Sequence, residues 1–245
     1  MALQDKVIIV TGAAAGLGRE YSLRLAREGA KLAIADVRDC SETAERVQAA
    51  GGQVIALQVD VSDEDQTKQM AKRTFDEYGR IDGLLNNAGM MRDLARESIL
   101  DIDMDVWDRV FAVNARGTFL GIRAVYPYMR EQGGGTIVNV SSGSTLRIAR
   151  AANENNPHYV SSKMAITGIT RAVARELGEH NINVITIAPG STTSDTDEAI
   201  DVEDAIPEPA AALQRRGYGP LDGVRVVVRV LRWILIVIAA CRALQ

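Results

Sequence analysis

Cysteine and histidine are scarce in this chain, whose 245 residues include only two of each. The cysteines, Cys40 and Cys241, lie far apart, and His158 and His180 complete no spacing that is typical of a metal site. Neither a disulfide framework nor a metal centre is therefore expected. The default compartment for such a chain is the reducing cytoplasm.

The sequence also has no long cluster of basic residues and no apolar run of membrane-spanning length. The formal net charge is −4, and this mild acidity argues against nucleic acid as the main partner. Asp5 and Lys6 lead directly into the first apolar stretch, so we expect no signal peptide. The apolar run at residues 233–241 is about half of a membrane span and follows several arginines. A membrane anchor is therefore not expected.

A short run of branched apolar residues at positions 7–10 begins the most informative stretch. The run breaks at Thr11-Gly12, and Gly16 and Gly18 then open a segment with helical spacing of its apolar residues. A strand, a glycine turn and a helix N-terminus together form an anion site, because backbone N–H groups and the helix dipole face a phosphate there. The alternative is a tight turn with no ligand.

Strand and helix patterns alternate along the rest of the chain. We expect strands at residues 7–10, 31–35, 54–59, 81–85, 136–140 and 182–187, and later helices at 42–50, 63–78, 105–131 and 157–178. This alternation predicts an α/β fold with a single doubly wound parallel sheet and helices on both faces. Ligands bind beyond the carboxyl ends of such strands. Polar or glycine clusters follow these strands, so we interpret the opening loop as a ligand site.

Short motifs occur in a fixed order at these strand ends. They are Thr11-Gly12-x-x-x-Gly16-x-Gly18, Asp60, Asn86-Asn87-Ala88-Gly89, Asn114, Ser142, Tyr159-x-x-x-Lys163 and Pro189-Gly190. Over about residues 5–194 the chain resembles the short-chain dehydrogenase/reductase family, which has a Rossmann fold and uses NAD(P). The resemblance implies one dinucleotide-binding and catalytic domain over residues 1–245. It also implies a small alcohol or ketone as substrate and a homo-oligomer, either a tetramer or a dimer.

Tyr159 and Lys163 are four residues apart in the predicted helix 157–178, so their side chains share a face. A tyrosine with its ordinary pKa of about 10 is a poor base at neutral pH. A neighbouring lysine cation stabilises the phenolate and lowers that pKa, which makes Tyr159 a usable general acid/base. The alternative is an exposed tyrosine–lysine pair on a helix surface.

A catalytic serine and asparagine are implied by the resemblance. The family motif places the serine second in such a pair, which favours Ser142 over Ser141 as the group that hydrogen-bonds the substrate oxygen. Asn114 resembles the family's asparagine that bends the long helix and holds a water for proton relay. A buried asparagine that is simply hydrogen-bonded within the helix is the alternative.

The choice of cofactor depends on the charge at the end of the second strand. Asp36 ends that strand, where its carboxylate can accept both ribose hydroxyls and would repel a 2′-phosphate. Residues 13–15 of the glycine loop are all alanine and offer no basic partner for such a phosphate. Arg38 is the local counter-argument. We therefore expect NAD(H).

Further cofactor contacts follow from the resemblance. Residues 60–61 resemble those that contact adenine, residues 87–89 those that line the adenosine ribose, and residues 189–192 the nicotinamide-side loop. Ser194 competes with Thr192 for the carboxamide, and an ordinary surface turn is the alternative for both. The full expected set is Gly12, Gly16, Leu17, Gly18, Asp36, Asp60, Val61, Asn87, Ala88, Gly89, Tyr159, Lys163, Pro189, Gly190 and Thr192.

The substrate side carries fewer motifs. The segment before Tyr159 is longer than is usual for the family, so we expect residues 146–158 to lie over the pocket. Met90, Met91 and Leu146 would form an apolar wall, although Met91 would serve equally as core filling. Residues 195–215 begin with an acidic stretch that suits a substrate lid, and a solvated loop is the alternative.

The last part of the chain, residues 221–245, departs from the family pattern. It replaces the expected seventh strand with a basic and then strongly apolar sequence. This tail suits a longer final helix, a helix that continues into an improvised strand, or an altered reading frame. The seventh strand is therefore in doubt, and so is the oligomer. An exposed apolar run here would also promote aggregation.

Together these observations predict an NAD(H)-dependent oxidoreductase that interconverts a secondary alcohol and its ketone. Tyr159 would exchange the proton, Lys163 lower its pKa, Ser142 hold the oxygen and Asn114 support the relay. One alternative is a 3-oxoacyl-thioester reductase, for which we would expect NADPH and a basic residue in the glycine loop. The other is a dinucleotide-binding protein without turnover, for which we would expect a broken catalytic set.

Overall fold

Six parallel strands form the centre of the computed structural model, which describes residues 2–91, 94, 98–146 and 156–190. The strands are β1 (Val7–Thr11), β2 (Lys31–Asp36), β3 (Gln53–Gln58), β4 (Gly83–Asn86), β5 (Gly135–Val140) and β6 (Ile182–Ile187). Their order in the sheet is β3-β2-β1-β4-β5-β6, and every pairing is parallel. This is the Rossmann order, which confirms the predicted doubly wound sheet. The question of a seventh strand falls on residues outside those described.

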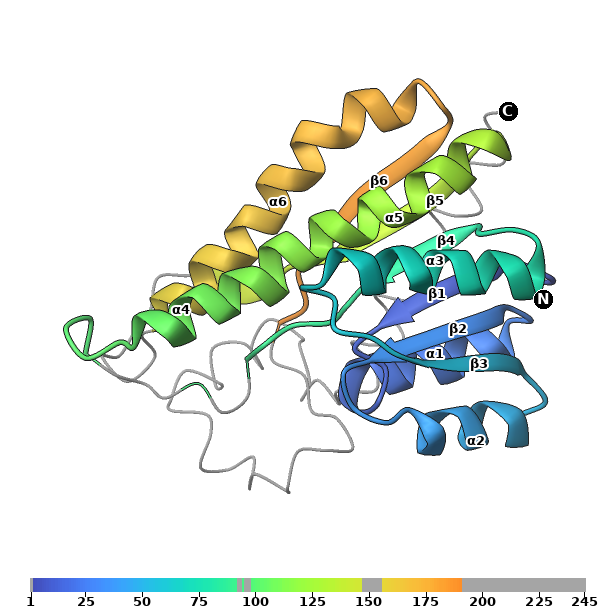
Figure 1. Cartoon of the computed structure of the whole chain (residues 1–245), viewed down its shortest axis with the longest axis horizontal. Helices are drawn as coiled ribbons and strands as arrows, with labels where there is room; N and C mark the ends of the chain where they lie inside the picture. The colour runs from blue at the N-terminus through green and yellow to red at the C-terminus, as the bar shows by residue number, and fades with distance from the viewer. Residues whose placement is uncertain (1, 92–93, 95–97, 147–155, 191–245) are drawn as a thin grey trace, which may run out of the picture.

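Helices cover both faces of the sheet (Figure 1). They are α1 (Gly16–Arg27), α2 (Ser41–Ala49), α3 (Glu64–Tyr78), α4 (Met104–Phe111), α5 (Gly117–Glu131) and α6 (Pro157–Gly178). One layer holds α1 and α2, which contact each other, and the other holds α3, α5 and α6. Among the described residues, no helix has the length and apolar character that a membrane span requires.

Successive residues of a strand face opposite helical layers, as the side-chain alternation of a strand requires. Val10 belongs to an apolar cluster with Leu25 of α1, whereas its neighbour Ile9 packs in a second cluster with Met70 of α3 and Val125 of α5. These five side chains are at most 3% exposed. A strand covered on both faces needs apolar residues at consecutive positions, which explains the unbroken run at residues 7–10.

The long helix that the sequence predicts at residues 105–131 is present but divided. Its two α-helical parts, α4 and α5, are joined by a π-helical segment, η1 (Ala112–Arg116), in which the Gly117 N–H donates to the Ala112 carbonyl five residues earlier. Single π-helical turns inside α-helices often occur at functional sites. Asn114 lies in this segment, so the helix is irregular at a predicted site residue.

The fourth strand begins at Gly83, two residues later than predicted. Ile81 is fully buried, but a side chain takes its backbone hydrogen bonds: the Ile81 N–H donates to Gln132 Oε1 (3.1 Å), and Gln132 Nε2 donates to the Ile81 carbonyl (2.7 Å). Backbone groups paired in this way need no strand partner. The apolar pattern alone therefore extends the strand too far.

Candidate active site

The glycine loop after β1 has no room for a side chain at Gly12 or at Gly18. Gly12 and Gly16 have φ angles of +67° and +60°, a backbone region that favours glycine. A Cβ on Gly18 would lie 2.0 Å from the Gly12 carbonyl oxygen, and one on Gly12 would lie 2.7 Å from the Cα of Ala88. Leu17 packs against the core cluster under α1. The loop and the first turn of α1 are therefore a tight backbone cradle, open to a group that approaches closely.

The N-cap residue of α1 contributes no side-chain hydrogen bond to the helix. Ala15 occupies the cap position, whereas in α3 the Asp63 carboxylate accepts hydrogen bonds from the amides of Asp65 and Gln66 (2.9 and 3.0 Å). The first amides of a helix need an acceptor from outside the helix, and an anion is well suited to the positive end of its dipole. The cradle thus fits the pyrophosphate of a dinucleotide.

The loop after β4 is bonded directly to this cradle. The Thr11 hydroxyl accepts hydrogen bonds from the amides of Asn87 and Ala88 (3.1 Å each), and Asn87 Nδ2 donates to the carbonyls of Thr11 and Gly12 (3.0 and 3.1 Å). Gly89 follows, and a Cβ there would lie 3.1 Å from Lys163 Nζ. Residues 87–89 therefore lie between the cradle and α6.

We expect Gly18→Ala to lower the free energy of unfolding by about 1–3 kcal/mol, because its methyl group overlaps the Gly12 carbonyl. Urea denaturation of the purified variant measures the loss. Gly168→Ala is the matched control, since nothing lies within 4 Å of a Cβ at that position of α6. This control should gain stability, by about 0.5–1 kcal/mol. Equal effects of the two substitutions would contradict the tight approach of the loop.

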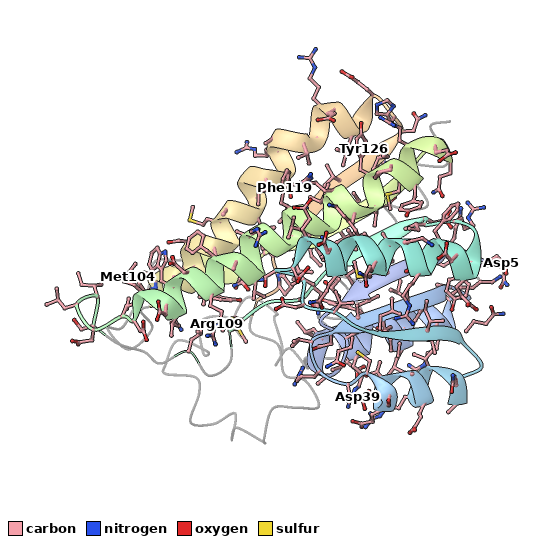
Figure 2. All side chains as sticks on the ribbon, in the orientation of Figure 1. Asp5, Asp39, Met104, Arg109, Phe119 and Tyr126 are labelled. Carbon is pink, nitrogen blue, oxygen red and sulfur yellow. The ribbon has the colours of Figure 1, made fainter. Side chains whose placement is uncertain are left out.

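Asp36 ends β2 and is 6% exposed. Its Oδ2 accepts a hydrogen bond from the Ala14 amide (3.0 Å), and its Oδ1 accepts from the Arg38 amide and Arg38 Nε (3.0 and 3.4 Å). A cavity of about 470 Å³ lies alongside, lined by Ala14, Ala15, Arg19, Arg38, Asp39, Glu42 and Arg46. Asp39 is labelled in Figure 2. The sequence predicts the carboxylate but not its pairing with Arg38, which partly neutralises it.

The segment after β3 holds the other acidic residue of the predicted set. Asp60 Oδ1 accepts hydrogen bonds from the amide and hydroxyl of Ser62 (2.9 and 2.7 Å), so this carboxylate stabilises its own turn. Val61 is 8% exposed, and a Cβ on Gly117 would lie 2.9 Å from its Cγ2. The start of α5 therefore packs closely on Val61, and both predicted residues lie at a carboxyl end of the sheet.

Tyr159 and Lys163 form a buried pair on α6 rather than a solvated one. Their exposed fractions are 8% and 4%, and Lys163 Nζ lies 5.9 Å from the centroid of the Tyr159 ring. The ammonium also donates to the Val140 carbonyl at the end of β5 (2.8 Å). The alternative of an exposed tyrosine–lysine pair is therefore wrong.

The acid–base properties of the pair differ from the expectation. Burial raises the pKa of Tyr159, and a hydrogen bond with Ser142 opposes that rise. Burial also lowers the pKa of Lys163 to about 8. The sequence predicts only a lowered tyrosine pKa, because spacing shows the neighbouring charge but not the loss of solvent around both groups. The hydrogen bond from the Ser142 hydroxyl favours the phenolate.

Ser141 and Ser142 are distinguished by their partners. Ser141 is 3% exposed, and its hydroxyl donates to the carbonyl of Lys163 (2.8 Å). Ser142 is half-buried and its hydroxyl is hydrogen-bonded to Tyr159 and to Ser144. Adjacent residues at a strand end point in opposite directions, so only one of the pair faces Tyr159. That residue is Ser142, the one that the resemblance favours.

Asn114 is fully buried, and its side chain makes three hydrogen bonds. Its Oδ1 accepts from the Met90 amide (2.7 Å), and its Nδ2 donates to the Met90 carbonyl (3.1 Å) and to the Ser162 hydroxyl (3.0 Å). Both amide hydrogens are thereby used. The side chain joins the loop after β4 to α6. Sequence reasoning missed Ser162, although its position beside Lys163 was the available signal.

The end of β6 reaches the same site. The carbonyl of Pro189 accepts a hydrogen bond from the Gly143 amide (2.7 Å), and a Cβ on Gly143 would lie 3.1 Å from the Cα of Gly190.

Met91 is 54% exposed, so its interpretation as core filling is wrong. Thr192, Ser194, the lid at 195–215 and the tail at 221–245 lie outside the described residues.

Comparison with known proteins gives concordant matches. A family model described as short chain dehydrogenase matches residues 6–205. Levodione reductase from Leifsonia aquatica is 38% identical over 192 residues, which cover 76% of this chain and 69% of that protein. The 3-oxoacyl-acyl-carrier-protein reductase FabG from Thermotoga maritima is 36% identical over 192 residues, 78% of this chain and 75% of the relative.

Solved structures agree with these relatives. A crystal structure of levodione reductase has a TM-score of 0.70 at 37% identity and covers 79% of this chain and 74% of its own. Carveol dehydrogenase from Mycobacterium avium in complex with NAD has a TM-score of 0.71 at 30% identity, with coverages of 77% and 71%. The chain belongs to the short-chain dehydrogenase family.

Proposed function

We propose that this protein is an NAD(H)-dependent oxidoreductase that interconverts a secondary alcohol and its ketone. The observation that carries the proposal is the pair of buried side chains Tyr159 and Lys163, with the half-buried Ser142 bonded to Tyr159, beside the glycine cradle. A nicotinamide dinucleotide bound there supplies or accepts the hydride. The side chains of the protein then need only to hold the substrate oxygen and exchange one proton with it.

Tyr159 is the proposed proton donor and acceptor. Its raised pKa keeps the phenol protonated at neutral pH, which suits proton donation to the oxygen of a ketone during reduction. In the direction of alcohol oxidation the phenolate is the base. The Lys163 cation then favours the phenolate while the pH stays below its own pKa of about 8. Ser142 donates a hydrogen bond to the oxygen on which charge develops.

Asn114 is proposed as a positioning residue. Its side chain holds Met90 and Ser162, and the Ser162 hydroxyl donates to the carbonyl of Tyr159 (2.7 Å). The turn of α6 that carries Tyr159 is thereby tied to the loop after β4. This arrangement supports a role for Asn114 in keeping the tyrosine and the loop at a fixed spacing.

Asp36 supports NAD over NADP, because its carboxylate repels a 2′-phosphate. We expect Asp36→Asn to lower the ratio of kcat/KM for NAD⁺ to that for NADP⁺ by about 10- to 100-fold, an electrostatic change of about 1.4–2.8 kcal/mol. The amide keeps an acceptor for the Ala14 N–H and releases Arg38 from its ionic partner. Initial rates with each cofactor give the ratio.

Asp39→Asn is the control for this ratio, because Asp39 lines the same cavity and bonds Ser41 rather than Arg38. Its ratio should stay within about twofold of the parent's, a change of less than 0.5 kcal/mol. The proposed cofactor would be contradicted if the parent protein catalysed the reaction faster with NADP⁺ than with NAD⁺.

The test of the proposed function uses the full chain with NAD⁺ or NADP⁺ and a panel of secondary alcohols. The absorbance of the reduced nicotinamide reports turnover. We expect reduction of NAD⁺ with at least one alcohol. NADH binding without turnover of any alcohol or ketone would instead favour a dinucleotide-binding protein without catalysis.

A reductase of 3-oxoacyl thioesters is the second candidate. Its support is the 36% identity to the Thermotoga maritima protein of that name. A 3-oxoacyl thioester assayed with NADPH and with NADH separates the two functions. Higher kcat/KM for the thioester with NADPH than for any simple ketone with NADH would favour this second function.

The proposal also covers the setting of the enzyme: a single-domain chain in the cytoplasm that forms a homo-oligomer. Large apolar side chains are exposed along α4, α5 and α6, among them Met104 (61%), Phe119 (40%) and Met164 (57%); Figure 2 labels the first two. Exposed apolar side chains of this kind suit burial against a second copy. Light scattering of the full chain gives the oligomeric state.

A further inference from the structure

Ser144 is a second hydroxyl group near the proposed catalytic pair, and the sequence motifs do not mark it. It lies on the short 3₁₀ turn η2 (Gly143–Leu146), which is separated from β5 by Ser141 and Ser142. Both its amide and its hydroxyl donate hydrogen bonds to Ser142 Oγ, at 3.2 and 2.9 Å. The side chain is half-buried. Ser144 thus contacts the hydroxyl of Ser142, which is bonded to Tyr159.

These two bonds, together with the bond to Tyr159, limit what Ser142 can do with its own proton. A serine hydroxyl has one O–H to donate and two lone pairs that accept. When Ser144 N–H and O–H both donate to Ser142 Oγ, the two acceptor positions are filled. The remaining capacity of Ser142 is its single O–H, which is then directed away from Ser144. The hydroxyl therefore acts as a donor toward Tyr159.

The turn that carries Ser144 is itself held firmly. The Ser142 carbonyl accepts hydrogen bonds from the amide and hydroxyl of Thr145 (3.1 and 2.7 Å), and the Gly143 amide donates to the Pro189 carbonyl (2.7 Å). These hydrogen bonds of Ser142, Gly143 and Thr145 hold the turn around Ser144 in place. A donor held in this way needs no rearrangement when charge develops at the site.

We propose that Ser144 is a positioning residue, which fixes the Ser142 hydroxyl as a hydrogen-bond donor first to the Tyr159 oxygen and then to the substrate oxygen. This inference rests on the proposed function of Tyr159 as the proton-exchanging group. Hydrogen bonds in a chain polarise one another, so the two donors on Ser144 also strengthen the bond that Ser142 gives. No covalent bond is made or broken by Ser144.

Ser144→Ala removes one of the two donors and leaves the backbone amide in place. We expect kcat for alcohol oxidation to fall by about three- to tenfold, the value of one hydrogen bond. The midpoint of the rise of kcat/KM with pH should move to higher pH, because a weaker bond from Ser142 favours the phenolate less. Ser144→Thr keeps a hydroxyl and should restore the parent midpoint.

Thr145→Val is the matched control. It removes a hydrogen bond from the same turn, but that bond goes to the Ser142 carbonyl and not to its hydroxyl. The control should therefore leave the pH midpoint where the parent has it. The proposal would be overturned if Ser144→Ala kept the pH midpoint of the parent. It would also be overturned if Thr145→Val shifted the midpoint by as much as Ser144→Ala does.

A second readout separates this inference from the proposed function. The ¹³Cζ resonance of labelled Tyr159, assigned by its loss in Tyr159→Phe, reports the hydrogen bond from Ser142 without turnover. It should shift in Ser144→Ala and stay in place in Thr145→Val. An inactive parent that shows this pattern would overturn the function but support the positioning role. An unshifted resonance in Ser144→Ala would overturn the positioning role.

Discussion

Tyr159→Phe is expected to lower kcat for alcohol oxidation by about 10²–10⁴-fold, the usual contribution of a general acid/base. The substitution removes only the phenolic oxygen, so the ring can stay in the position where Tyr159 is 8% exposed. Cofactor affinity should change little, because the glycine cradle and Asp36 remain. Steady-state rates and the fluorescence of bound NADH measure the two effects separately.

Tyr126→Phe is the matched control for this experiment. Tyr126 lies on α5, packs against His180 and Arg130, and is labelled in Figure 2. The control removes the same atom from a tyrosine outside the site and should keep kcat within about twofold of the parent. If Tyr159→Phe also kept the parent rate, the proposed proton transfer would be wrong.

Lys163→Met should change activity and stability in opposite directions. The variant loses the cation that favours the Tyr159 phenolate, so we expect kcat to fall by at least about 10²-fold. It also removes a charge whose burial is unfavourable, as the pKa of about 8 shows. Because the hydrogen bond to the Val140 carbonyl is lost too, we expect a net gain of about 1–3 kcal/mol in the free energy of unfolding at pH 7.

The effect of Lys163→Met on the free energy of unfolding should depend on pH, because the pKa of Lys163 differs between the folded and the unfolded chain. The pKa of Lys163 is about 8 in the folded chain, below the ordinary lysine value of 10.5 that the unfolded chain keeps. Between these values the unfolded chain binds more protons, so the contribution of Lys163 to stability rises with pH and is lost as pH falls through about 8. The stability difference between Lys163→Met and the parent should therefore shrink from pH 7 to pH 10.

Urea denaturation at several pH values measures that difference. Lys72→Met is the control, because Lys72 is an exposed partner of Asp76 on α3. An exposed pair of this kind contributes about 0–1 kcal/mol, and its removal should bring no gain in stability. A Lys163→Met variant that is less stable than the parent at pH 7 would show that burial of the lysine carries no such penalty.

The sheet was predictable because its signals are local. Four apolar residues in a row at 7–10 require a strand that is covered on both faces, and the structure has helices on both. The glycine loop was predictable for a similar reason, since Gly18 leaves space that any Cβ would fill. Tyr159 and Lys163 share a helix face at a spacing of four residues, which is a property of the helix itself.

The remaining features depend on contacts between distant segments, which sequence spacing does not contain. The resemblance implies a bend of the long helix at Asn114, but no composition signal shows the π-helical segment at 112–116 or the contacts of Asn114 with Met90 and Ser162. The Asp36–Arg38 pairing depends on one side-chain conformation. The raised pKa of Tyr159 depends on how deeply packing buries the ring. In each case the predicted residue stays a candidate site residue, but its contacts or its pKa are known only from the structure.

The central claim is that hydride passes between an alcohol carbon and a nicotinamide while Tyr159 takes the proton. Its most direct test is a secondary alcohol deuterated at the carbinol carbon, incubated with NAD⁺ and the full chain. We predict one deuterium at C4 of the nicotinamide, formed slowly or not at all by Tyr159→Phe. NADH without deuterium, or equal transfer by the variant, would contradict the account.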